Sequence, residues 1–496
     1  MKTNMIIIAL LFFVVITSSA FSQKIEYSTF IGGSKNDGDN SWLKHFSIDE
    51  AGIVYFAMCT NSEDFPVTDN AYDKTYNGGN NWGQEDLVIV QFNVDQNKLN
   101  YASYFGGSSG PEFAVQVLFK DNKLFIAGNT GSPDFPIAGN AYDKTFNGPD
   151  FRHADGFLSR FISNRLDYST FIGTSGIEAM KFVDLGTDAE MIVAGELKNW
   201  EEIPITFAFS KEKLENNSNA CLIRFNERGD TILSATLLGP TWNTITVRDK
   251  SGNIYIAGNT PSKNFPVTPQ ANDTSYNGGK EHYYGDIFIT KLSPTGDRII
   301  FSTYLGGSED ESISDICIDG DNNIIVCGQT FSKDFPITGN AFDESFDGTI
   351  EPFIAKLDSS GSHLLYSSFL GGNEKDKNEY IQNMAISENG EIYLCLRANT
   401  TGFPVTSNAM FPRSRGGVDI ILSVLNNTLT KLKYSTYIGG SGNDFGVVEL
   451  DTYGNPVIVG GTSSSDFPVT PGSYDTTYNG GGSDLFVMKI KMDSSH

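Results

Sequence analysis

The sequence is poor in basic residues, in cysteine and in histidine. Its 496 residues include 35 Lys and Arg against 60 Asp and Glu, which gives a formal net charge of -25. A surface of that charge repels phosphate backbones and anionic lipid headgroups, so it argues against nucleic acid and membrane surfaces as partners. Five histidines in the whole chain also leave little material for general acid–base or metal chemistry.

Long apolar runs are absent once the N-terminus is set aside. Lys2, the apolar run from Met5 to Ile16 and the small residues near Ala20 predict a signal peptide over residues 1–22. The run is too short to span a bilayer, and no cysteine follows it to carry a lipid. We therefore expect a secreted or periplasmic protein with no transmembrane segment, whose mature chain covers residues 23–496.

Cysteine is too sparse for a disulfide framework. All five cysteines lie in apolar, strand-like runs, and a chain of this length does not need covalent cross-links to be stable. We expect free, buried thiols. Cys317 and Cys327 flank one tight turn and are the only pair whose bridging merits a check.

What the sequence has in abundance is internal repetition. A phrase of the type Tyr-Ser-Thr-Phe-Ile-Gly-Gly-Ser occurs seven times, with a spacing of roughly 68 residues between copies. The copies begin at Tyr27, Tyr101, Tyr168, Ile232, Phe301, Tyr366 and Tyr434. A fixed period of this kind indicates a chain built from repeated structural units.

Each repeat contains four short runs with the alternation and the β-branched and aromatic residues typical of strands. In the fifth repeat they cover residues 313–319, 323–329, 352–358 and 363–369, and we name them a, b, c and d. Short turns of hairpin type join a to b and c to d. Each repeat is therefore predicted to be a four-stranded antiparallel meander.

The order of strands at the two ends predicts a closed ring. A lone d strand over residues 24–31 precedes the first complete repeat, and a c strand over residues 483–492 ends the last one. The N-terminal d strand thus completes the blade whose strands a, b and c come from the C-terminus. We predict one all-β domain, a seven-bladed β-propeller with four-stranded antiparallel blades.

The repeated phrases resemble a known family. YSTYIGGSGNDF, SSSDFPVT and YDTTYNGGGSDLFVMKIK, together with their copies, are similar to the SBBP family of bacterial secreted β-propeller repeats over nearly the whole mature chain. The resemblance implies a seven-bladed propeller and an exported location, and it carries no common activity or catalytic residue set. The third repeat departs most, with Glu201-Glu202-Ile203-Pro204 in place of Asp-Phe-Pro.

The alternation of strand direction assigns the loops to two faces of the disc. The d-to-a and b-to-c connections emerge on one face, and the short a-to-b and c-to-d turns emerge on the other. The long b-to-c loops carry a Phe-Pro pair in six repeats, and we expect each of these phenylalanines to pack between neighbouring blades. Because binding residues usually lie on loops held by a rigid scaffold, the long-loop face is where function is expected.

Acidic residues recur in register on the long-loop face. One set precedes Phe-Pro (Asp64, Asp134, Asp334, Asp466), a second lies within the loop (Asp73, Asp143, Asp273, Asp343, Asp475), and a third precedes strand c (Asp86, Asp155, Asp286, Asp419, Asp484). A fourth follows the glycine pair (Asp37, Glu178, Glu311, Asp376, Asp444). We expect most to cap turns. The alternative is Ca²⁺, the one cofactor that the composition suggests, with Asp37, Glu311, Asp376 and Asp444 as candidate ligands.

Residues outside the repeat pattern are the candidates for ligand contact, because architecture explains repeats and not exceptions. The candidates on the long-loop face are Trp42, Trp82, Trp200, Trp242, His282, Tyr283, Tyr284, Arg413 and Arg415. Aromatic side chains suit sugar rings and apolar side chains, and aromatic residues with arginine are enriched at interfaces. The alternative is that these aromatics only fix long loops in place.

The predicted function is an exported binding scaffold that engages a glycan, a peptide or an envelope protein. A structural part of a cell-envelope or secretion assembly is the alternative. Lyase or glycosidase activity is a third hypothesis, which rests only on acid pairs. We expect no enzyme, since the chain has no Gly-x-Ser-x-Gly elbow with a partner, no His-Glu-x-x-His and no phosphate-binding glycine loop.

Overall fold

The computed structural model describes residues 23–38, 43–78, 85–148, 154–215, 217–278, 284–372 and 379–492. The predicted signal peptide, residues 1–22, lies outside these ranges. Within them, no helix has the length and apolar character needed to cross a membrane.

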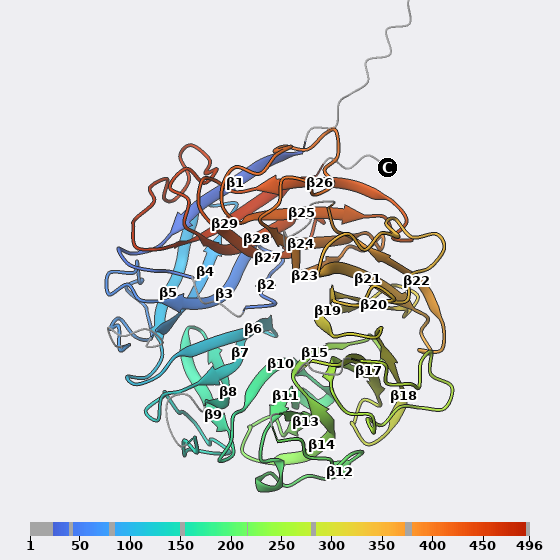
Figure 1. Ribbon diagram of the computed structural model, residues 1–496. Coiled ribbons are helices and arrows are strands. Elements are labelled where there is room, and N and C mark those ends of the chain that lie inside the picture. The colour runs from blue at the N-terminus through green and yellow to red at the C-terminus, as the bar shows by residue number, and fades with distance from the viewer. Residues whose placement is uncertain are drawn as a thin grey trace, which may run out of the picture.

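Seven β-sheets stand side by side in a ring, so the fold is the predicted seven-bladed β-propeller (Figure 1), and we call the centre of the ring the channel. In each blade the strands follow one another from the channel to the rim as an antiparallel meander, and the innermost strand is strand a of the repeat. Alternating side chains bury both faces of every sheet against the neighbouring blades, which explains the nearly continuous burial of the b and c strands.

The strand bounds of the first three blades are as follows. Blade 1 contains β2 (Ser47–Ile48), β3 (Ile53–Thr60), β4 (Asp86–Asn93) and β5 (Lys98–Phe105). Blade 2 contains β6 (Glu112–Lys120), β7 (Lys123–Thr130), β8 (Asp155–Ile162) and β9 (Arg165–Ile172). Blade 3 contains β10 (Ala179–Leu185), β11 (Met191–Leu197), β13 (Ser218–Phe225) and β14 (Ile232–Thr241).

Blades 4 to 7 complete the ring. Blade 4 contains β15 (Asn243–Arg248), β16 (Ile254–Thr260), β17 (Asp286–Leu292) and β18 (Ile299–Leu305). Blade 5 contains β19 (Glu311–Ile318), β20 (Ile324–Thr330), β21 (Glu351–Leu357) and β22 (Leu364–Phe369). Blade 6 contains β23 (Glu379–Ile386), β24 (Ile392–Ala398), β25 (Asp419–Leu425) and β26 (Leu432–Ile438). Blade 7 contains β27 (Asp444–Leu450), β28 (Pro456–Thr462), β29 (Asp484–Lys491) and β1 (Lys24–Ile31).

Blade 7 closes the ring in the way the sequence predicts. The N-terminal strand β1 pairs antiparallel with the C-terminal strand β29, from Lys24 opposite Lys491 to Ile31 opposite Leu485. The two ends of the chain thus form the outer half of one blade, shown in blue and red side by side in Figure 1. Since no covalent bond closes the ring, this strand pairing carries the closure.

Blade 3 is the irregular blade, as its sequence indicates. It adds a fifth strand, β12 (Phe207–Ala208), parallel to β14, and two short 3₁₀ turns, η1 (Thr187–Ala189) and η2 (Trp200–Glu202). In four of the other blades an Asp before Phe-Pro accepts an N–H from the d-to-a loop, and here Glu202 accepts the N–H of Ser175 at 2.8 Å. Ile203 is buried where the other blades have phenylalanine.

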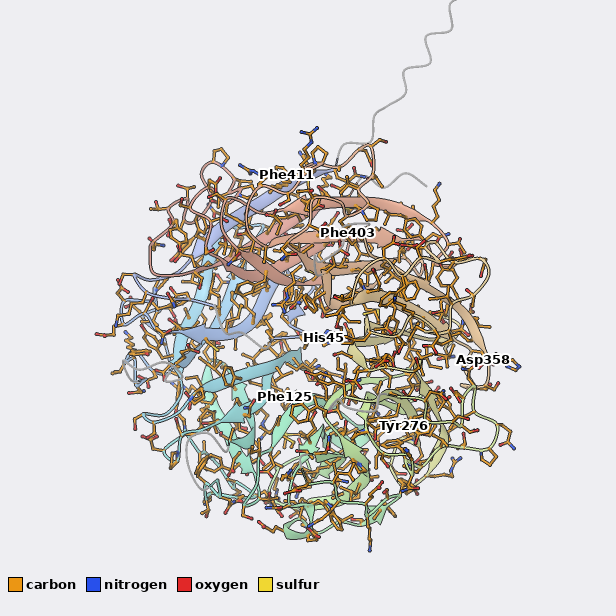
Figure 2. All side chains as sticks on the ribbon, in the orientation of Figure 1. His45, Phe125, Tyr276, Asp358, Phe403 and Phe411 are labelled. Carbon is orange, nitrogen blue, oxygen red and sulfur yellow. The ribbon has the colours of Figure 1, made fainter. Side chains whose placement is uncertain are left out.

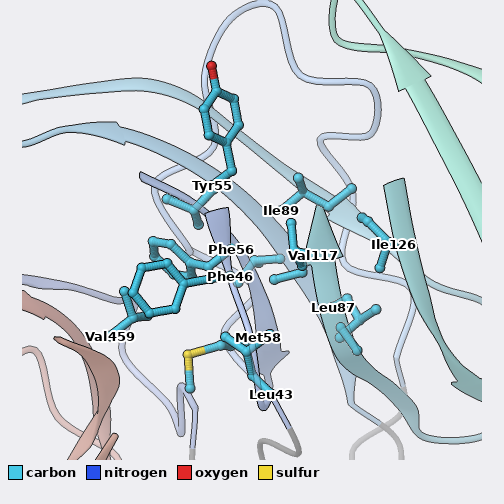
Figure 3. Packing of buried hydrophobic residues seen from close by; sticks show 14 of the residues in the cluster. Leu43, Phe46, Tyr55, Phe56, Met58, Leu87, Ile89, Val117, Ile126 and Val459 are labelled. Carbon is cyan, nitrogen blue, oxygen red and sulfur yellow. The ribbon is translucent and has the colours of Figure 1, made fainter. Parts of the chain in front are cut away.

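The Phe-Pro phenylalanines are buried between blades, as predicted. The ring of Phe135 lies 4.6 Å from that of Phe157 in its own blade and 4.9 Å from that of Phe105 in the preceding blade, measured between centroids. Figure 3 shows the same principle nearer the channel, where Phe56 and Met58 of blade 1 lie by Val459 of blade 7. Apolar contacts of this kind hold neighbouring blades together.

All five cysteines are buried thiols, which confirms the sequence prediction. Cys317 and Cys327 do not face each other across their hairpin, because Cys317 pairs with Ile325 and Cys327 pairs with Asp315. The Sγ of Cys317 instead contacts the Sδ of Met384 in the next blade at 3.7 Å.

A polar segment of blade 1 reaches into the channel and links distant blades. The imidazole of His45, labelled at the centre of Figure 2, lies 2.9 Å from Glu449 of blade 7 and 3.2 Å from Asp315 of blade 5. Next to it, the Nζ of Lys44 donates to the carbonyl of Gln382 in blade 6 at 2.9 Å. Burial lowers the pKa of His45, but the two carboxylates outweigh it and raise the pKa to about 10.

The closing strand yields a prediction with an internal control. Phe30 in β1 and Phe369 in β22 occupy the same repeat position, are both buried, and lie 6.3 Å and 6.4 Å from Phe467 and Phe335 respectively. Replacing either with alanine is expected to cost about 3–5 kcal/mol of stability, because a large buried side chain is lost. Only Phe30→Ala should also loosen β1, so limited trypsin digestion should remove the N-terminal strand faster. Equal cleavage of the two variants would contradict closure by β1.

His45 yields a prediction of pH dependence. Its pKa in the folded protein is raised, so the stability it contributes is fully present below its unfolded pKa, near 6.5, and is lost as the pH rises through about 10. At pH 7 we expect wild type to have a higher melting temperature than His45→Gln. The difference between the two melting temperatures should decrease steadily towards pH 10. A difference that stays constant in melting curves over this interval would show that His45 is neutral in the fold.

Candidate functional site

Two of the four sets of repeated acids cap loops, as expected. Asp134 accepts the N–H and the hydroxyl of Ser108 in the preceding d-to-a loop, at 2.8 and 2.6 Å, and its pKa is lowered by these bonds. Asp73 accepts the N–H of Thr75 at 2.8 Å within its own loop. The same bonds recur in other blades, so these carboxylates fix the loops on the long-loop face.

The acids that begin strands c and a behave differently, because they meet in buried pairs where one blade joins the next. Six of the seven blade junctions have such a pair among the described residues. The pairs are Asp484–Asp37, Asp86–Glu112, Asp155–Glu178, Asp286–Glu311, Glu351–Glu379 and Asp419–Asp444. The first glycine of the repeated Gly-Gly phrase, or Gly173 in Gly-Thr, packs against each pair.

The candidate calcium ligands that the structure describes belong to these acid pairs. Asp37, Glu311 and Asp444 lie at three different junctions, each with its own acidic partner, and Asp376 lies outside the described residues. Burial, assisted by Asp286, raises the pKa of Glu311 to about 8, and burial raises that of Asp37 to about 6. Among the described residues, no group of three or more His, Cys, Asp or Glu side chains is arranged to hold a metal.

The junction between blades 3 and 4 is the exception to this pattern. Here β14 ends at Thr241 and β15 begins at Asn243, so Trp242 alone forms the d-to-a connection. The Gly-Gly-Ser segment is replaced by Gly239-Pro240-Thr241, which belongs to β14, and Ser218 stands where the other six blades begin strand c with an acid. The connection between β14 and β15 is therefore one residue long, and Trp242 is 42% exposed.

A cavity of about 740 Å³ opens at this junction on the long-loop face. Most of its lining comes from the inner strands and loops of blades 2, 3 and 4. Residues 43–45 of blade 1, Ser312 of blade 5 and Gln382 of blade 6 complete it, so the cavity extends to the centre of the ring. Apolar side chains at its mouth include Ile177, which is 47% exposed, with Trp242 and Tyr284. The rings of Trp242 and Tyr284 stand perpendicular, with their centroids 6.1 Å apart. We call this space the blade 3–4 cavity.

The polar lining of the blade 3–4 cavity carries both signs of charge, from Lys44, His45, Lys181 and Lys198 and from Glu178 and Glu196. The Nζ of Lys181 lies 2.7 Å from a carboxylate oxygen of Glu196 and 2.7 Å from the Oδ1 of Asn243. Glu178 accepts hydrogen bonds from the hydroxyl and N–H of Thr174. The Oδ1 of Asn129, a lining residue, is buried and has no hydrogen-bond partner. The cavity thus offers an aromatic edge and paired polar groups, a combination typical of small-ligand sites.

The structure separates the predicted ligand contacts into three groups. Trp242 and Tyr284 lie together in the cavity, whereas Arg413 and Arg415 lie on the β24–β25 loop of blade 6, away from it. The guanidinium of Arg415 instead contacts Asp466 at 3.7 Å and the carbonyl of Gly439. The candidates that lie outside the described residues are Trp42, Trp82, His282 and Tyr283.

The prediction for Trp200 is wrong. Its side chain is only 9% exposed, packs in the core of blade 3 and is covered by Lys213, whose Nζ lies 5.6 Å from the ring. Trp200 therefore fixes the long loop of blade 3, which was the alternative for all of these aromatics.

Sequence reasoning missed several residues of the cavity. Ile177, Lys181, Glu196 and Asn129 belong to strands and loops of two blades and share no motif. The one available signal was the length of the loop at Trp242, where the repeat loses its Gly-Gly-Ser segment. A second cavity of about 640 Å³ lies on the opposite face, between turns of blades 6 and 7.

Comparison with known proteins supports the fold. No protein-family model matches the sequence, and no curated protein matches it significantly. Among solved structures, an ulvan lyase of polysaccharide lyase family PL25 covers 92% of this chain and 95% of its own, with a TM-score of 0.51 and 8% identity. The β-propeller domain of the Trilobed protease from Pyrococcus furiosus covers 95% of this chain and 96% of its own (TM-score 0.43, 11% identity). BamB from Moraxella catarrhalis covers 94% and 99% (TM-score 0.37, 9% identity). The overlap with the ulvan lyase shows a similar overall fold, and an identity of 8% leaves the activity open.

Proposed function

We propose that this protein is an exported binding scaffold that takes a neutral glycan into the blade 3–4 cavity. The observation that carries the proposal is the exposed Trp242 at the single junction where the repeated loop is lost. A flat aromatic edge suits the C–H face of a sugar, and hydroxyl groups can bond to paired polar side chains without bringing charge.

The net charge of the chain favours a neutral ligand over an anionic one. Within the cavity, Lys181 is paired with Glu196, while Lys44 and Lys198 bond to the backbone carbonyls of Gln382 and Glu215. The formal net charge of -25 works against anionic polymers at longer range. An exported location, which the sequence predicts, would bring the protein into contact with envelope or environmental glycans.

The pKa of His45, which lines the cavity, fits binding without catalysis. His45 is held as an imidazolium by Asp315 and Glu449, with its pKa raised to about 10. A histidine that is already protonated near neutral pH has no lone pair with which to act as a general base. We propose that the cavity holds its ligand rather than transforming it.

The test is Trp242→Ala in the purified mature chain, with an array of neutral oligosaccharides followed by calorimetry on each oligosaccharide that binds. We expect affinity to fall at least about tenfold, since losing a central aromatic contact costs more than about 1.4 kcal/mol. Tyr453→Ala is the matched control, because Tyr453 is 82% exposed on the opposite face. Unchanged melting temperatures would show that both variants remain folded.

Other outcomes would overturn the proposal. If Trp242→Ala binds as tightly as wild type, the cavity is not the site. If no neutral glycan binds and a peptide library gives a Trp242-dependent ligand, the cavity serves peptide recognition. If the protein is instead recovered from the native envelope in a stable complex that Trp242→Ala leaves intact, the chain is a structural component of an assembly.

A further inference from the structure

Two of the buried acid pairs differ from the rest in their hydrogen bonding. Among the described residues, Asp86 Oδ1 and Glu112 Oε2 at the junction of blades 1 and 2 have no hydrogen-bond partner, and both side chains are completely buried. At the junction of blades 4 and 5, the same holds for Asp286 Oδ1 and Glu311 Oε2. Each of these junctions therefore has two buried carboxylate oxygens without a hydrogen-bond donor from the described chain.

The unsatisfied oxygens are directed at a common point. The position that a Cβ would take on Gly106 lies 2.5 Å from Asp86 Oδ1 and 2.9 Å from Glu112 Oε2. On Gly306 the corresponding distances are 2.8 Å to Asp286 Oδ1 and 2.5 Å to Glu311 Oε2. Any side chain at these glycines would occupy the space beside the two oxygens, which explains why the repeat has glycine here.

The other oxygen of each carboxylate is held in place. Asp86 Oδ2 accepts the N–H of Asn77 at 2.7 Å, and Glu112 Oε1 accepts the hydroxyl of Thr130 at 2.9 Å. Asn277 and Thr330 make the same two bonds at the other junction, each at 2.7 Å. One oxygen of each acid is therefore anchored while the second is left facing its partner acid.

No positive group of the described chain compensates these acids. None of the four forms an ion pair with a lysine, arginine or histidine within the described ranges. Two facing carboxylates in a buried site repel each other and lose their hydration, and each effect is costly without a counter-charge. Something outside the chain must neutralise them.

We propose that a calcium ion binds between Asp86 and Glu112 beside Gly106, and a second between Asp286 and Glu311 beside Gly306. Calcium prefers oxygen ligands, accepts irregular coordination and can complete its ligand set with carbonyls and water, which suits a pair of carboxylates. Each ion joins strand c of one blade to strand a of the next. The calcium sites are independent of the glycan site in the blade 3–4 cavity, so either proposal can fail alone.

The other pairs are not assigned an ion. At Asp419–Asp444 and Asp484–Asp37 only one of the facing oxygens is unsatisfied, because Asp444 and Asp37 each accept an N–H from the second glycine of the repeat. We therefore expect two calcium ions per chain.

The experiment uses the mature chain, freed of metal with a chelator and dialysed at pH 7.5. Calcium is added up to about 10 mM, above the dissociation constants of about 10⁻⁴ to 10⁻³ M found in extracellular calcium modules. We expect the melting temperature to rise by at least about 2 °C and equilibrium dialysis to give two ions per chain. Terbium should give tyrosine-sensitised luminescence, since Tyr76 and Tyr276 adjoin the residues that bond to Asp86 and Asp286.

Isosteric variants locate the ions. Glu112→Gln and Glu311→Gln keep the shape of the side chain and its bond from threonine, and each should remove one bound calcium. The double variant should lose the calcium-dependent rise in melting temperature and the terbium signal. Asp134→Asn is the matched control, because Asp134 lies in the neighbouring loop and bonds only to Ser108, so it should still bind two ions.

The results that overturn the proposal are equally definite. If 10 mM calcium changes neither the melting temperature nor the bound metal of wild type, the pairs are neutralised by protons. The same conclusion follows if both glutamine variants bind calcium as wild type does. The two sites lie at separate junctions. If one variant fails to fold, the other variant and the terbium titration of wild type still test whether calcium binds.

Discussion

Closure of the ring is the constraint on which the rest of this molecule depends. Each blade buries its two faces only against its neighbours, so an open ring would expose an apolar sheet at each end. The outer closure is the pairing of β1 with β29. An inner closure runs along the channel, where polar side chains of strand a bond to the next blade, as in Gln116 to Val183 and Asn383 to Val448. His45 completes this belt through Glu449.

A closed ring of repeats also limits which loops can depart from the repeat sequence. Loops at six junctions are committed to architecture, because their glycines and acids are packed between blades. The junction of blades 3 and 4 lacks the acid pair and keeps only the first glycine of the repeated pair, Gly239, which is followed by Pro240. Blade 3 compensates with its own extra strand, β12, beside β14. The cavity beside Trp242 is the consequence of that one local departure.

The fold could be predicted from the sequence because each repeat shows the same local pattern of strands and turns. Strand order, blade number, the shared blade and the buried Phe-Pro rings all follow from patterns within one repeat or from its phase at the two ends. The cavity does not, because Ile177 and Trp242 meet only after the blades are placed side by side. The burial of Trp200 could not be predicted either, because the sequence does not show whether a tryptophan in a loop faces solvent or the core. The acids were visible in register, but their pairing joins strand c of one blade to strand a of the next.

The two kinds of proposed site therefore lie at two kinds of junction. The calcium sites lie at junctions that hold the ring together, and the glycan site lies at the one that is open to solvent. At a closed junction the facing acids are buried, so a bound cation would replace their mutual repulsion with a link between blades. At the blade 3–4 junction, Ser218 and Asn243 bring no such charge, and the space can instead be filled by a neutral ligand. Restoring an acid there would bring a charge into a cavity whose Lys181 is already satisfied by Glu196. The absence of the acid pair at this junction is thus a requirement for the cavity.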